Sequence, residues 1–320
     1  MHGDGRSGAT REDRAIVEAR AKAAASEAAV LASPLHDVPD DPGSAKPDPI
    51  LTVDGVARSF GGLQAVAVDR LEVQRAAITG LIGPNGAGKT TFFNLLTGFD
   101  RPDTGAWWFE GRKLAGLPAH RVARRGMVRT FQLTKALTRL TVMENMQLAA
   151  VGQRGERFLD ALLRPLWRGQ ESQVTRRAEE LLERFRLAEM RDEFAGTLSG
   201  GQRKLLEMAR VLMVEPSMVM LDEPMAGVNP ALTQSLLGHV TDLRDQGMTV
   251  LFVEHDMDVV MGISDWVVCM AQGRIIAEGT PARIRANRAV IDAYLGGHHD
   301  EPTPDEPTPD GHGPDARGEG

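Results

Sequence analysis

The sequence predicts an α/β fold for residues 50–297, with a separate helical lobe at about residues 142–213. Short apolar runs of strand length alternate with stretches of helical composition, which is typical of a sheet covered by helices. Three of these runs are almost continuously apolar, as expected for strands buried on both faces. Between residues 142 and 193, in contrast, strand-like runs are nearly absent, which indicates a region of several helices.

The individual elements follow from the same local patterns. Strands are predicted at Ile78–Ile82, 218–221, 248–253 and 266–270, and helices at Lys89–Leu96, 202–213, Pro230–Asp245 and Met257–Ile263. The first strand runs into a glycine-rich turn, and the first helix begins directly after it. We expect Trp107 and Trp108 to belong to the core and the sheet face, and the methionines between Met208 and Met225 to fill the core.

The two ends of the chain are predicted to be extensions outside this fold. Residues 1–49 contain an alanine- and charge-rich stretch at 11–29 with few large apolar side chains, followed by prolines spread over residues 34–49. Residues 298–320 are acidic and proline-rich, and the sequence EPTPD occurs twice in succession. We expect both extensions to be of low complexity and disordered.

Charge and cysteine content disfavour several classes of protein. The formal net charge is −7, but the acids gather in the two ends, so residues 50–299 are close to neutral. A nucleic-acid-binding surface would require a basic excess, and we therefore expect no nucleic-acid partner. The single cysteine, Cys269, points to a reducing compartment. We expect neither a transmembrane helix nor a signal peptide, because long apolar runs are missing.

A phosphate-binding loop is predicted between the first strand and the first helix. The pattern G-x-x-x-x-G-K-[ST] is met without a mismatch by Gly83, Pro84, Asn85, Gly86, Ala87, Gly88, Lys89 and Thr90. The glycines allow the backbone N–H groups to approach phosphate oxygens, and the start of the helix adds partial positive charge. We expect Lys89 to contact the β- and γ-phosphates, Thr90 to bind Mg²⁺ and Thr91 to contact the α-phosphate.

Two acidic residues follow the apolar strand at 218–221. Asp222 is expected at the sheet edge beside the phosphate loop, where it can order Mg²⁺. Glu223, one residue further on, faces the other way and can accept a proton from an attacking water. The sequence contains no Asn-Lys-x-Asp segment that would read guanine, which disfavours a GTPase.

The segment from Leu198 to Gln202, LSGGQ, together with the two motifs above, resembles the ATP-binding subunits of ABC transporters. The resemblance covers about residues 50–297. It implies a P-loop NTPase fold with a RecA-like core, an antiparallel β subdomain and a helical signature subdomain, and it implies ATP and Mg²⁺ as ligands. It also assigns further site residues: Phe60 to adenine stacking, Gln132 to the metal and catalysis, His255 to catalysis, and Ser199, Gly200, Gly201 and Gln202 to the nucleotide of a partner subunit.

Several short segments narrow the resemblance to the branched-chain amino acid importer group. They are FGGLQAV at 60–66, LTGF at 96–99, GMVRTF at 126–131, PMAGVNP at 224–230, EHDM at 254–257, VMGISD at 260–265 and AYLG at 293–296. Two positions depart from the usual pattern. Ala76-Ala77 replaces a Gly-Glu pair before the first strand, so that this turn is expected to differ, and Asn229 replaces an acid common in the wider family.

The resemblance implies an ATPase that energises uptake of branched-chain amino acids or a related small polar solute. It implies a second ATPase subunit, either another copy or a sister chain, that closes on ATP in a nucleotide-sandwich dimer. Transmembrane permease subunits, a solute-binding protein and a peripheral position on the cytoplasmic face of the inner membrane are also implied. The alternatives are an importer of urea or other amides, a nucleotide-gated binding module without hydrolysis, and a soluble ABC ATPase acting on nucleic acid or ribosomes. The last is disfavoured by the single ATPase domain and the lack of a heptad run.

Overall fold

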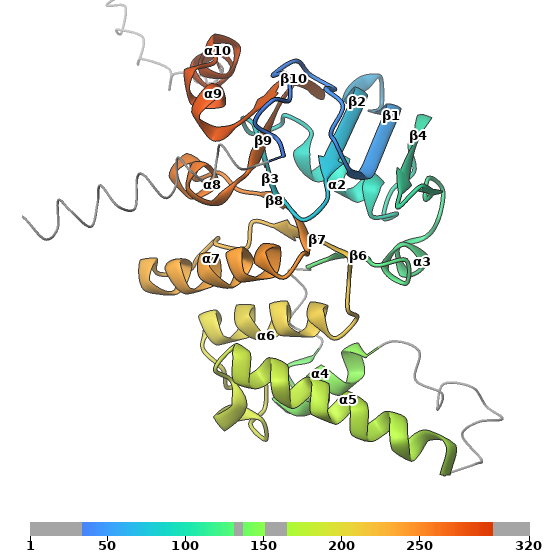
Figure 1. Ribbon diagram of the computed structural model, residues 1–320, viewed down its shortest axis with the longest axis vertical. Helices are drawn as coiled ribbons and strands as arrows, with labels where there is room; N and C mark the ends of the chain where they lie inside the picture. The colour runs from blue at the N-terminus through green and yellow to red at the C-terminus, as the bar shows by residue number, and fades with distance from the viewer. Residues whose placement is uncertain (1–33, 131–136, 151–164, 297–320) are drawn as a thin grey trace, which may run out of the picture.

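The computed structural model describes residues 34–130, 137–150 and 165–296. Two sheets occupy one end of the molecule and a helical lobe occupies the other (Figure 1). The stretch predicted as helical at 11–29, the EPTPD repeats and Gln132 lie outside the described residues. Within the described residues, no helix is both long enough and apolar enough to cross a lipid bilayer.

The central sheet has six strands in the order β10-β9-β3-β8-β7-β6. Their bounds are β3 (Ile78–Ile82), β6 (Met127–Arg129), β7 (Met218–Asp222), β8 (Thr249–Val253), β9 (Trp266–Ala271) and β10 (Arg274–Gly279). All neighbouring pairs are parallel except β9 and β10. The four predicted strands are therefore confirmed, with ends that differ by a residue.

Successive side chains of these strands enter two different hydrophobic cores, because side chains alternate between the two faces of a sheet. Val219 and Leu221 of β7 belong to the core shared with the helical lobe, whereas Met218 and Met220 belong to the core under the second sheet. Both faces are covered by apolar groups, which is why the sequence of each strand is a nearly continuous apolar run.

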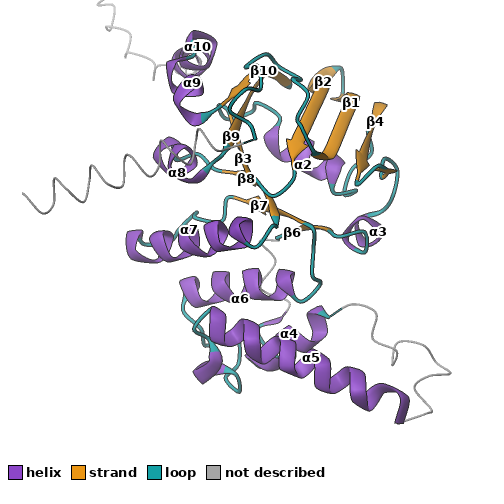
Figure 2. Cartoon of the chain, in the orientation of Figure 1, coloured by secondary structure: helices purple, strands orange, loops and turns teal. Residues whose placement is uncertain are grey.

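A second, antiparallel sheet has the order β2-β1-β4-β5 (Figure 2). Its strands are β1 (Pro49–Phe60), β2 (Leu63–Gln74), β4 (Thr104–Phe109) and β5 (Arg112–Lys113). Trp107 of β4 is fully buried in the core between this sheet and helix α2 (Lys89–Leu96). This sheet corresponds to the antiparallel β subdomain that the resemblance implies.

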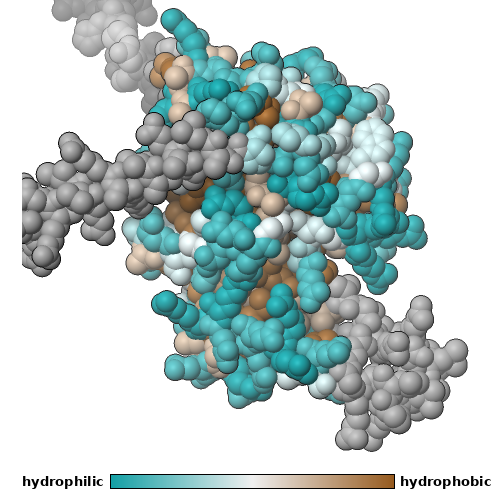
Figure 3. All heavy atoms as spheres, viewed as in Figure 1, coloured by the Kyte–Doolittle hydropathy of each residue, from teal (hydrophilic) through white to brown (hydrophobic). Residues whose placement is uncertain are grey.

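The helical lobe contains α4 (Val142–Ala149), α5 (Pro165–Arg184), a short 3₁₀ helix at Ala188–Met190 and α6 (Gly200–Leu212). Capping boxes begin both α4 and α6, at Thr141 and Ser199, and each satisfies backbone N–H groups that the helix leaves free. The apolar faces of these helices share one core with α7 (Pro230–Asp245) and the central sheet. In Figure 3, apolar residues are visible between the lobe and the upper part, while most of the surface is hydrophilic.

The remaining helices are short and surround the central sheet. They are α3 (Ala119–Ala123), α8 (Met257–Ile263), α9 (Pro281–Ala286) and α10 (Arg288–Gly296). Helices α9 and α10 follow the edge strand β10 and contribute Ile284 and Val290 to the core of the helical-lobe side. They bring the end of the described chain back to the sheet.

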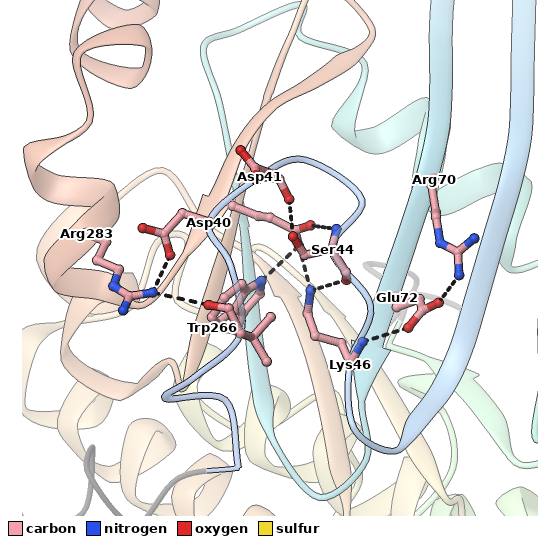
Figure 4. A network of polar contacts seen from close by, with 10 residues as sticks. Asp40, Asp41, Ser44, Lys46, Arg70, Glu72, Trp266 and Arg283 are labelled. Carbon is pink, nitrogen blue, oxygen red and sulfur yellow. Dashed lines mark hydrogen bonds and ion pairs between the residues drawn. The ribbon is translucent and has the colours of Figure 1, made fainter.

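Residues 34–49 pack against the domain, so the prediction of a separate N-terminal extension is wrong for this stretch. Leu35 and Val38 are buried in the core of the antiparallel sheet. The Lys46 ammonium lies 3.1 Å from Glu278 Oε2 of β10, and both side chains are inaccessible to solvent. The backbone N–H of Lys46 donates to Glu72 of β2 at 2.7 Å (Figure 4). The prolines predict no regular element here, but Lys46 finds a charged partner 232 residues further along the chain.

Candidate functional site

The phosphate loop joins β3 to α2, and its backbone requires glycine at both ends. Gly83 has a φ of 151°, and a Cβ there would collide with the carbonyl oxygen of Met270 on β9. Gly88 has a φ of 97°, and a Cβ there would collide with the carbonyl oxygen of Ala65. Gly83 and Gly88 therefore lie where neither the φ angle nor the space admits another side chain, whereas Gly86, with a φ of 75°, is restricted by its φ angle and not by space.

Lys89 lies buried beneath this loop. Its Nζ donates hydrogen bonds to the carbonyl oxygens of Gly83, at 2.6 Å, and Pro84, at 3.0 Å. Burial lowers the pKa of the Lys89 ammonium, and the carboxylate of Glu223 is the largest influence in the opposite direction. Gly88 at the N-cap provides no side chain that could occupy the first N–H groups of α2. The loop and the helix start thus offer the donors that a polyphosphate requires.

The two acids at the end of β7 have different partners. Asp222 forms an ion pair with Arg129 of β6, whose guanidinium also donates to Asn94 Oδ1 at 2.6 Å. Glu223 adopts a left-handed backbone conformation with a φ of 47°, and its N–H donates to the carbonyl oxygen of Val253.

His255 follows β8 and meets Glu223. Its Nε2 lies 2.7 Å from Glu223 Oε1. The structure thus brings together two of the three residues that we predict to be catalytic, across a sequence separation of 32. The third, Gln132, is outside the described residues.

Two residues that support this site are absent from the predicted set. Lys204 of α6 reaches across to the turn after β7, where its Nζ donates to the carbonyl oxygens of Pro224, at 2.9 Å, and Glu223, at 3.4 Å. Glu254 accepts a hydrogen bond from the N–H of Met225 at 2.7 Å, and burial raises the pKa of its carboxyl. Their positions, two residues after the signature and directly before His255, are the sequence signals that could have indicated them.

A hollow of about 340 Å³ separates α6 from the end of β7. It is lined by Thr130, Gly200, Lys204, Glu207, Asp222 and Glu223 among others. The carboxylates of Asp222 and Glu223 and the start of the signature helix α6 therefore line the same cavity.

The signature residues form the start of α6. Ser199 Oγ accepts a hydrogen bond from the N–H of Gln202 at 3.2 Å, and Gln202 Oε1 accepts one from the N–H of Ser199 at 2.9 Å. Gly201 packs against Leu232 of α7 so closely that a Cβ would collide with it. Ser199 and Gly200 are exposed, so this helix start is accessible to another chain.

Phe60 ends β1 with about half of its surface exposed. The guanidinium of Arg58 lies over the ring at 4.6 Å from its centroid. Arg58 is itself held by ion pairs with Asp100 and Asp103. An exposed ring supported in this way is available for stacking and does not plug the core.

The phosphate loop, the strand-end carboxylates and the capped signature helix define an ATPase of the ATP-binding cassette class. Comparison with known proteins agrees: the model of the ABC transporter family matches residues 67–226, and that of the branched-chain amino acid ATP-binding cassette transporters matches residues 274–300. The chain therefore belongs to the ABC transporter ATP-binding family. It binds ATP and is an ATP-hydrolysing subunit of a transporter.

The relatives are similar over nearly their whole length. The high-affinity branched-chain amino acid transport ATP-binding protein BraF of Pseudomonas aeruginosa is 45% identical over 250 residues, which are 78% of this chain and 98% of the relative. LivG of Escherichia coli, with the same description, is 44% identical over the same shares. A crystal structure of a nucleotide-free ATP-binding cassette from an ABC transporter has a TM-score of 0.68 and 35% identity, and covers 77% of this chain and 98% of its own.

Proposed function

We propose that this chain is the ATPase subunit of an importer for branched-chain amino acids. The observation that carries the cargo assignment is the 44–45% identity to relatives described as high-affinity branched-chain amino acid transport proteins. The match of residues 274–300 to the branched-chain family model supports it, because this segment lies beyond the shared ATPase motifs. The subunit would sit on the cytoplasmic face of the inner membrane and work with permease subunits and a solute-binding protein.

For ATP binding, the chain supplies Lys89 and backbone N–H donors at the end of the phosphate loop and the start of α2. Lys89 would leave the carbonyl oxygens of Gly83 and Pro84 and contact the β- and γ-phosphates. Phe60 would stack on adenine, where an aromatic contact contributes of order 1 kcal/mol. N–H groups within residues 85–91 would hold the phosphates, which fits the uncapped start of α2.

For hydrolysis, Glu223 would accept the proton of the attacking water. His255, already 2.7 Å from that carboxylate, would hold it and the water in line with the γ-phosphate. Thr90 and Asp222, with Gln132, would hold Mg²⁺, which when bound neutralises phosphate charge. Among the described residues no cluster of three or more His, Cys, Asp or Glu side chains forms a metal site. A small number of protein ligands is sufficient for Mg²⁺, because this ion binds through one or two carboxylates together with substrate phosphates and water.

The second half of the site would come from another subunit. Ser199, Gly200, Gly201 and Gln202 present a helix start at the surface of this chain, and such a start attracts anions. We propose that this start closes on the γ-phosphate held by a sister chain or a second copy. The resulting dimer would bind ATP at two shared sites.

The test is transport by the complete complex in sealed vesicles. The complex, with its permease and binding protein, is supplied with ATP and radiolabelled leucine, isoleucine and valine, with urea as the competing cargo. We expect ATP-dependent uptake of the amino acids and none in the Glu223→Gln complex. Uptake of urea alone would contradict the cargo assignment, and a complex that hydrolyses ATP without ATP-dependent uptake of any of these solutes would contradict the transport assignment.

A further inference from the structure

The C-terminal helix α10 touches the phosphate loop through a single tyrosine. Tyr294 lies in the AYLG segment at 293–296, which the proposed ATPase site does not use, and it is the one tyrosine in the sequence. Its hydroxyl oxygen accepts a hydrogen bond from the N–H of Gly83 at 2.8 Å, across 211 residues. The AYLG segment, one of those that resemble the branched-chain amino acid importer group, therefore contacts the first residue of the phosphate loop.

Gly83 is consequently held from both sides. Tyr294 binds its N–H, while Lys89 donates to its carbonyl oxygen at 2.6 Å. The backbone of Met270 on β9 also packs against Gly83, and leaves no space for a Cβ at this position. The conformation of the loop at its first residue thus depends on contacts from α2, β9 and α10.

The tyrosine hydroxyl stays neutral under physiological conditions. Burial raises the pKa of Tyr294 to about 12, and the neighbouring Cys269 acts in the same direction. A neutral acceptor can hold the N–H of Gly83 without placing negative charge beside the phosphates. Helix α10 itself is fixed by Val290, which is buried in the core of the helical-lobe side.

We propose that Tyr294 is a positioning residue for the phosphate loop, so that nucleotide affinity depends on α10 being docked. This inference rests on the proposed movement of Lys89 from the carbonyl oxygen of Gly83 to phosphate. Once Lys89 has moved to phosphate, Tyr294 is the one of these two side chains that still binds the backbone of Gly83. In a variant without the Tyr294 hydroxyl, the N–H of Gly83 loses its hydrogen-bond partner. ATP must then order the loop as it binds, which lowers the affinity for ATP.

The coupling acts in both directions. If docking of α10 raises ATP affinity by some factor, ATP must stabilise the docked helix by the same factor. Nucleotide binding will therefore slow hydrogen exchange in residues 288–296, although this helix follows the ATPase motifs in sequence.

The first experiment compares Tyr294→Phe with Leu295→Ala, a control on the exposed face of the same helix. Mg-ATP affinity is measured by calorimetry on full-length protein that also carries Glu223→Gln, which prevents turnover. We expect Tyr294→Phe to raise the Kd about three- to tenfold, the factor carried by one ordinary hydrogen bond, and Leu295→Ala to stay within twofold. With Glu223 intact, KM for ATP should rise by the same factor while kcat changes less than twofold.

The second experiment needs no substitution in the helix. Hydrogen exchange of residues 288–296 is followed with and without Mg-ATP, and slower exchange with nucleotide supports the coupling. An unchanged Kd in Tyr294→Phe, an equal loss in Leu295→Ala, or exchange that nucleotide leaves unaltered would overturn the inference. Failure of the parent protein to bind Mg-ATP would instead refute the ATPase assignment, so the two failures are distinguishable.

Discussion

Replacing Lys46 with methionine should destabilise the domain, although Lys46 belongs to none of the ATPase motifs. The side chains of Lys46 and Glu278 are 1% and 0% exposed, and their charged atoms are 3.1 Å apart. Removing one partner of a buried ion pair leaves an uncompensated charge and costs about 3–5 kcal/mol. The Glu278 carboxylate keeps hydrogen bonds from Trp266 Nε1, at 2.9 Å, and the N–H of Ser44, at 2.7 Å. We therefore expect a loss of about 3 kcal/mol.

The Lys46–Glu278 ion pair should stabilise the domain by less than the stability that Lys46→Met removes. Burial lowers the pKa of Lys46 despite the nearby Glu278, so desolvation outweighs the attraction between the two charges. A neutral pair of similar shape, Lys46→Met with Glu278→Gln, should therefore recover part of the lost stability. Ser44 donates to Oε1 and Trp266 to Oε2 of Glu278, so the single amide oxygen of the glutamine keeps one of these two hydrogen bonds.

Urea unfolding followed by tryptophan fluorescence measures these changes, because Trp266 packs against the Lys46 ammonium. For a domain of this size, a loss of about 3 kcal/mol corresponds to a Tm lower by about 6–12 °C. Asp40→Asn is the matched control, since the Asp40–Arg283 pair lies in the same region but is about two-fifths exposed, and it should cost below about 1 kcal/mol. A loss below about 1 kcal/mol for Lys46→Met, or a double variant worse than the two single variants together, would refute the reasoning.

Three further changes test other parts of the structure. Ala76 has a φ of 52°, so Ala76→Gly should stabilise the domain by about 0.5–1 kcal/mol in urea unfolding; a loss of stability would contradict the left-handed assignment. Burial raises the pKa of Glu207 to about 7, above its unfolded value, so stability should fall as pH rises from about 4.5 to 7. Glu207→Gln should remove that fall and stabilise the protein at pH 8 by about 1–2 kcal/mol after solvent screening; an unchanged pH profile would contradict this. Lys204→Met should lower kcat about tenfold with little change in ATP affinity, because Lys204 anchors the backbone of Glu223; an unaltered kcat would exclude that role.

The parts of the fold that could be predicted are those encoded by continuous local patterns. The strand at Ile78–Ile82 and the strand before Asp222 are buried on both faces, so their apolar runs are visible in the sequence. The phosphate loop is likewise local. The antiparallel sheet was implied only by the resemblance, because its strands are irregular: β1 has register shifts between Arg58 and Ser59 and between Asp54 and Ala57.

What could not be predicted depends on contacts distant in sequence. The segment at 34–49 looks like a proline-rich loop, but Lys46 finds its partner 232 residues later. The bond from Gly83 to Tyr294 spans 211 residues, and neither local sequence indicates the other. The turn at Ala76-Ala77 was expected to differ from the family pattern, and the structure shows alanine in a left-handed conformation that favours glycine.

The central claim is that Glu223 is the base of an ATPase whose nucleotide site is otherwise intact without it. The most direct measurement is single-turnover hydrolysis of radiolabelled ATP by the complete complex, alongside ATP binding, for the parent protein and Glu223→Gln. We predict that the variant retains ATP with an affinity within threefold of the parent, while hydrolysis slows at least about a hundredfold. Hydrolysis at the parent rate would contradict the assignment of the base, and loss of ATP binding by the variant would contradict the separation of binding from chemistry.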